Sequence, residues 1–115
     1  MSAQTQVIDV VEPFSFDLPP TFDEVVEISR AGGLPPQRLP VVFRYRTRKE
    51  LDELRDELAG KSDAEALEEM LVDWQVPGKP FNRENAEEFA NKFPRGPTEV
   101  LETYFRAYWT AKAKN

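Results

Sequence analysis

The chain lacks cysteine and histidine altogether. Without cysteine it has no disulfide, no thiolate nucleophile and none of the usual cysteine-based zinc sites. Without histidine it also lacks the commonest general base and metal ligand, which excludes Ser-His-Asp, Cys-His and histidine-based metal chemistry. Carboxylate-only mechanisms remain, and carboxylates can still hold Mg²⁺ or Ca²⁺. We therefore predict that the protein is not an enzyme and uses no cofactor or metal.

Glycine-rich motifs and long apolar runs are also missing. The only glycine pair, Gly32-Gly33, is followed by prolines, and neither a phosphate-binding loop nor a calcium-loop spacing occurs. No apolar run approaches the roughly 20 residues that a membrane helix needs. Residues 1–6 lack the apolar segment of a signal peptide. These absences predict a cytoplasmic protein with no membrane partner.

The composition is that of a small globular domain. The chain has 115 residues, of which 40% are hydrophobic and 31% charged, a balance typical of folded proteins. The net charge of −6 favours solubility and repels nucleic acid. We expect a flexible tail or an edge strand over residues 1–13 and a single α+β domain over 14–115. Within it, 14–46 form the β part and 47–115 the helical part.

Alternating apolar residues predict a small antiparallel sheet of two or three strands near the N-terminus. The strands are expected over 14–18, 22–30 and 39–46, with a further short strand over 7–11. Residues 31–38 are rich in glycine and proline and should form an exposed connection. The side chains expected on the buried face are Phe14, Phe16, Leu18, Phe22, Val26, Ile28, Leu39, Val41, Phe43 and Tyr45.

Four helices are expected to follow the sheet. Thr47 with Glu50, and Ser62 with Glu65, have the spacing of capping boxes, and Asn82 is a plausible cap for a third helix. Gly60 suits the position just after the first helix, and the last helix spans 98 to about 111. The apolar stripes are Leu51, Leu54 and Leu58; Leu67, Met70, Leu71 and Trp74; and Ala86, Phe89, Ala90 and Phe93.

The last helix has more apolar surface than one core contact requires. Its apolar residues cover about half the circumference, whereas an arc of roughly 100° is enough to pack on a core. The surplus, on the Phe105–Trp109 side or the Tyr104–Tyr108 side, either docks a partner or is covered because a thin domain wraps the helix on two sides. The candidate partner-binding residues of this helix are Leu101, Tyr104, Phe105, Tyr108 and Trp109.

Two other segments allow two interpretations each. Trp74, Val76 and Phe81 flank a Pro-Gly linker and form either an exposed partner-binding knuckle or, as we favour, a plug between the second and third helices. The basic residues of 44–49 either contact nucleic acid or, as we favour, line the solvated face of a strand whose charges acidic helices neutralise.

Motifs in a fixed order link this sequence to a known family. Phe-x-Phe-x-Leu-Pro-Pro-Thr-Phe spans 14–22, Phe-Arg-Tyr-Arg-Thr-Arg-Lys-Glu-Leu spans 43–51, and Lys-Ser-Asp spans 61–63. Asp-Trp-x-Val, Pro-Phe-Asn-Arg-Glu-Asn and Phe-Pro-x-Gly-Pro follow, before a closing aromatic helix that ends in Lys-Asn. Together they resemble the phage tail assembly chaperones of long-tailed phages and prophages.

The resemblance implies a role without catalysis. Such a chaperone is expected to bind the tape-measure protein in the host bacterial cytoplasm, keep it soluble during tail assembly, and be absent from the mature virion. Contacts with other tail assembly proteins, or self-association, are compatible with this role. The alternative function is an acidic DNA-mimic inhibitor of a host nuclease, whose binding would weaken steeply with salt.

Overall fold

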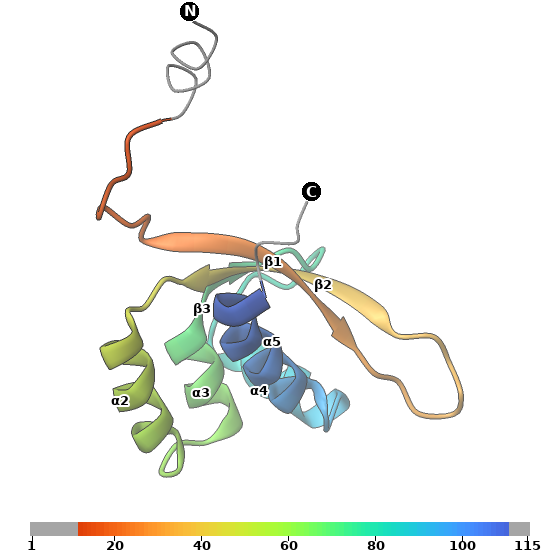
Figure 1. The fold of residues 1–115 in the computed structure, drawn as a ribbon. Coiled ribbons are helices and arrows are strands. Elements are labelled where there is room, and N and C mark those ends of the chain that lie inside the picture. The colour runs from red at the N-terminus through yellow and green to blue at the C-terminus, as the bar shows by residue number, and fades with distance from the viewer. Residues whose placement is uncertain (1–11, 111–115) are drawn as a thin grey trace, which may run out of the picture.

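The fold is a three-stranded sheet with four helices against one of its faces (Figure 1). The computed structural model describes residues 12–110. Both strand pairs are antiparallel, in the order β1-β2-β3, so the expected α+β class is confirmed. The elements, in chain order, are β1 (Thr21–Ile28), β2 (Gln37–Arg44), α2 (Arg48–Leu58), α3 (Asp63–Met70), β3 (Leu71–Trp74), α4 (Arg83–Lys92) and α5 (Gly96–Thr110).

The third strand comes from a segment that was expected to be helical. The helix that begins at Asp63 ends at Met70, and Leu71–Trp74 runs as β3 beside β2. The prediction of a helix through Trp74 is therefore wrong. Leu71 and Trp74 are still buried, as the apolar stripe required. The helical spacing correctly predicted which side chains of this segment are buried, but pairing with β2, which is distant in the sequence, makes the segment a strand.

The N-terminal segment contains a second error. Residues 12–20 form no strand, and all are exposed. The predicted strand over 14–18 is therefore wrong: Phe14 and Phe16 are each 88% exposed, and Leu18 is 54% exposed. We call residues 12–20 the arm; it leads away from the start of β1 (Figure 1). The strand expected over 7–11 lies outside the described residues.

The β1–β2 hairpin follows the predicted pattern. Its register places Val26 opposite Leu39 and Phe22 opposite Phe43. The strand expected over 39–46 already ends at Arg44. In the connection, Gly32 and Gly33 have φ values of 80° and 74°, which only glycine adopts without strain.

Local capping chemistry explains where the helices begin. Both predicted capping boxes are present: the Thr47 hydroxyl accepts from the Glu50 N–H while the Glu50 carboxylate accepts from the Thr47 N–H, and Ser62 and Glu65 repeat the pattern. These hydrogen bonds hold the pKa of both glutamates below the usual value. Asn82 caps α4.

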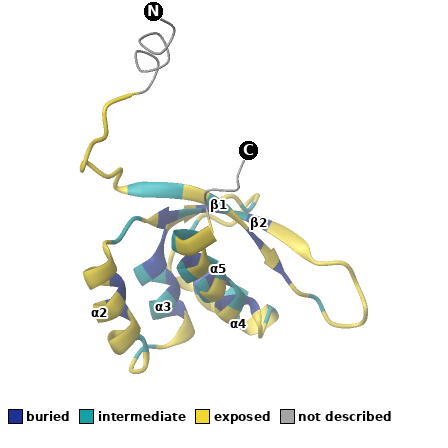
Figure 2. Cartoon of the chain, in the orientation of Figure 1, coloured by how far each residue is buried: buried dark blue, intermediate teal, exposed yellow. Residues whose placement is uncertain are grey.

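The core lies between the sheet and the helices (Figure 2). Its largest fully buried side chains are Tyr104, Phe43, Leu54, Leu67, Met70, Leu71, Val26 and Val100. The opposite face of the sheet is uncovered by helices (Figure 1), and Val25 and Val72 are exposed. Across residues 12–110, no helix combines the length and apolar character required to span a membrane.

Candidate partner-binding surface

One side of α5 belongs to the core. Tyr104 is fully buried and lies parallel to Phe22, with ring centroids 6.3 Å apart. Its hydroxyl donates to the backbone oxygen of Arg44 at 2.7 Å. Tyr108, one turn later, donates to the same oxygen at 3.2 Å. The Tyr104–Tyr108 side therefore anchors the helix to the end of β2, with Tyr104 buried and Tyr108 partly buried.

Arg46 completes this polar anchor. Its backbone N–H donates to the Tyr108 hydroxyl, while Nη1 donates to the Glu69 backbone oxygen at 2.7 Å and to the Tyr104 hydroxyl at 3.0 Å. Nη2 pairs with the Glu69 carboxylate at 3.1 Å, and only 16% of the Arg46 side chain is exposed. The expectation that Arg46 lines a solvated face is wrong, although an acidic helix does neutralise its charge. Burial also raises the pKa of Tyr108.

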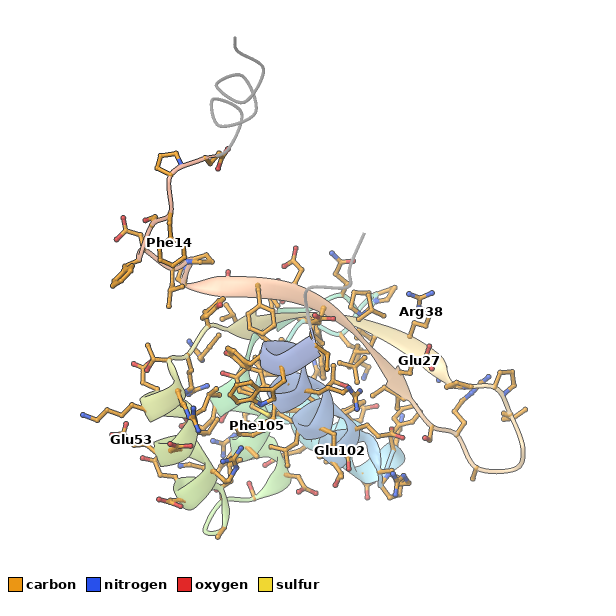
Figure 3. The ribbon with its side chains drawn as sticks, viewed as in Figure 1. Phe14, Glu27, Arg38, Glu53, Glu102 and Phe105 are labelled. Atoms are coloured by element: carbon orange, nitrogen blue, oxygen red, sulfur yellow. The ribbon has the colours of Figure 1, made fainter. Side chains whose placement is uncertain are left out.

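The other side of α5 carries an apolar strip that α2 only partly covers. Leu101, Phe105 and Trp109 follow one another at four-residue spacing, which aligns them along one face. Leu101 and Phe105 are half-buried against the core, whereas Trp109 is 64% exposed. We call these three residues the aromatic strip. Figure 3 shows Phe105 in front of α5, on the side towards α2.

Two arginines of α2 lie over the aromatic strip. The Arg55 guanidinium is 4.7 Å from the centre of the Phe105 ring, and that of Arg48 is 5.9 Å from the centre of Trp109. Such cation–π contacts stabilise by only about 0.5–1 kcal/mol each at exposed sites, and the Arg55 side chain is 60% exposed. The arginines thus cover only part of the aromatic strip, and Trp109 remains 64% exposed beside Arg48.

The sequence pattern identified the rings but not the arginines. Arg48 and Arg55 are seven residues apart on α2 and therefore share a face, yet the sequence does not show that this face meets α5. Arginines on a helix rich in acidic residues do not by themselves indicate that an aromatic ring lies beneath them.

The candidate residues near β3 form a plug, as favoured from the sequence. Trp74 is 6% exposed, packs edge-on against Phe81 and Phe89, and donates from its indole nitrogen to the Lys79 oxygen at 2.7 Å. Phe81 and Val76 are half-buried at its border. Trp74 thus joins β3 to α4, and only Val76 and Phe81 present an edge of the plug to solvent.

Several carboxylates of the described residues serve helix caps and surface ion pairs. Within residues 12–110, no group of three or more acidic side chains is placed to hold a metal ion. Hydrogen bonds in the helix caps lower the pKa of Glu50 and Glu65, and hydrogen bonds from Lys79 and Lys92 lower that of Glu88. The contacts that the aromatic strip offers are apolar and aromatic.

Comparison with models of known protein families gives a match over most of the chain. The chain matches the model of a family described as phage tail assembly chaperone over residues 12–115. No curated protein matches the chain. No solved structure matches it either.

Proposed function

Because the chain belongs to the phage tail assembly chaperone family, we propose that it binds the tape-measure protein and keeps it soluble while the tail assembles. Proteins of this family act in the host during phage assembly, and the family implies a role without catalysis. The proposal includes action in the bacterial cytoplasm and release before the virion is complete.

The observation that carries the proposal is the aromatic strip. From Leu101 to Trp109 it spans nine residues of α5, or eight residue steps, which at 1.5 Å per step is about 12 Å, or roughly two helical turns. A helix-binding groove needs apolar anchors of this kind along one line. A tape-measure helix with apolar residues at three- and four-residue spacing would replace the guanidinium groups on the rings of Phe105 and Trp109.

The charge of the chain complements this role. The net charge of −6 keeps the chaperone soluble while it presents an exposed tryptophan. It also opposes non-specific clustering of chaperones through their apolar surfaces. Many copies, each with a modest contact, can cover a long substrate because linked contacts strengthen one another.

Co-expression with the tape-measure protein of the parent phage tests the proposal. Wild type should keep the tape-measure protein in the soluble fraction at moderate salt. Trp109→Ala should weaken the contact by about 2 kcal/mol, or roughly thirtyfold, because a few residues, tryptophan prominent among them, supply most of the binding energy of an interface. Leu34→Ala is the matched control, since Leu34 is an exposed apolar residue on the hairpin connection.

Two results would contradict the proposal. One is an equal yield of soluble tape-measure protein with wild type and Trp109→Ala. The other is recovery of a host nuclease in place of a tail protein, with binding that falls steeply as salt increases; that result would favour the DNA-mimic alternative.

A further inference from the structure

The arm carries apolar side chains that do not pack against the core of the fold. Phe14 and Phe16 touch each other edge-on, with ring centroids 5.5 Å apart, yet both remain almost fully exposed. Figure 3 shows Phe14 on the arm, away from the body of the fold. Exposing two phenylalanine rings costs roughly 1.5–3 kcal/mol each compared with burying them. Such a segment gains free energy from any apolar hollow that accepts both rings.

Two neighbouring hollows lie beside the plug that Trp74, Val76 and Phe81 form. One, of about 170 Å³, lies between Trp74 and α4, and the other, of about 240 Å³, lies beside Ile28 and Leu39. They share three walls, namely Val76, Phe89 and Phe93. We call them the Val76 hollows. A cavity of about 150 Å³ is large enough for a benzene ring, so each hollow has room for one phenyl group.

We propose that the Val76 hollows receive Phe14 and Phe16 from the arm of a second copy of this chain. Residues two apart on an extended segment point to the same side, about 6.6–7 Å from each other. Adjacent hollows with common walls suit that spacing.

Charge also favours this pairing. The lining of the two hollows includes Arg38, Lys79 and Lys92 but a single carboxylate, Glu88, a balance of 3 − 1 = +2 in a chain of net charge −6. The arm carries Glu12 and Asp17 and no basic residue. Its two acidic groups therefore approach a surface of opposite net charge.

In the structure the arm does not occupy its own hollows. The second hollow includes Ile28, at the end of β1 opposite the arm. The arm leads away from the start of β1 (Figure 1), and Phe14 and Phe16 are each 88% exposed. The Val76 hollows of one chain are therefore open to the arm of a second copy.

Sedimentation velocity of the purified full chain over a range of concentrations tests the inference without any tape-measure protein. Wild type should associate as its concentration rises. Phe14→Ala/Phe16→Ala should associate at least about a hundredfold more weakly, because both buried rings are lost. This variant should keep the fold, since both rings are 88% exposed and lie outside the core. Leu34→Ala should behave as wild type.

A mixing experiment separates the two surfaces. Val76→Lys, checked for its fold by circular dichroism, keeps the arm and blocks the hollows, whereas Phe14→Ala/Phe16→Ala keeps the hollows and loses the rings. Each variant alone should stay monomeric, and an equimolar mixture should form a complex. A wild type that is monomeric throughout, an arm variant that associates like wild type, or a mixture without a complex would each overturn the inference. Because the assay contains only this chain, such a result leaves the tape-measure proposal untouched.

Discussion

Replacing Arg46 with methionine tests whether the polar anchor stabilises the fold. The change keeps an unbranched apolar stem that ends where Nε lies in arginine, and it removes the guanidinium. Two hydrogen bonds from the charged Nη1 are lost, to the Glu69 backbone oxygen at 2.7 Å and the Tyr104 hydroxyl at 3.0 Å. Hydrogen bonds from charged donors contribute about 1.5–3 kcal/mol each. The lost pair with the Glu69 carboxylate adds little, because that group is 38% exposed.

The free energy of unfolding should fall by about 3 kcal/mol, which is about 1.5 kcal/mol for each of the two lost hydrogen bonds. We take the lower end of the range for each bond because the site is only partly buried. Small domains have about 5–15 kcal/mol in total, so the loss is large. Urea denaturation followed by circular dichroism measures it as a lower midpoint at an unchanged m-value.

Arg44→Met is the matched control, since the Arg44 side chain is exposed and only its backbone oxygen takes part in the anchor. It should change the stability by no more than about 0.5 kcal/mol. If Arg46→Met and Arg44→Met cost the same, Arg46 does not stabilise the fold through the anchor, and the reasoning is refuted.

Three further changes test other parts of the structure. Gly96→Ala should destabilise by about 1–3 kcal/mol in thermal unfolding, because the added Cβ would lie 2.6 Å from the Phe89 ring; an unchanged Tm would show that the ring moves freely. Ser62→Ala removes a helix cap and should cost about 1 kcal/mol in urea, with no loss contradicting the capping box. Hydrogen bonds from two lysines lower the pKa of Glu88 to about 2. Its stabilisation is therefore complete above its unfolded pKa near 4.5 and is lost as the pH falls towards 2, so wild type and Glu88→Gln should converge in acid; a constant difference between them would refute this.

Local patterns in the sequence were sufficient for much of the fold. Capping chemistry at Thr47, Ser62 and Asn82 is decided within a few residues of each helix start, so the sequence predicted all three. The hairpin followed from alternation, and the apolar excess of the last helix pointed to the aromatic strip. Ordered motifs pointed to the family that the comparison then confirmed.

Tertiary structure alone decided the rest. Leu71 and Trp74 fit a helical stripe, but β2 supplies hydrogen-bond partners that make the segment a strand, and local periodicity contains no information on a partner some thirty residues away. Phe14 and Phe16 alternate like a strand, yet nothing in their own fold covers them.

The same limit applies to the site. The sequence placed Tyr104 and Trp109 together as candidates, and only packing against the sheet separated the buried ring from the exposed one. The sequence determined which residues are apolar and where helices begin, because propensity and capping are local. The tertiary structure determined which apolar residues remain exposed, because burial depends on what lies across the fold.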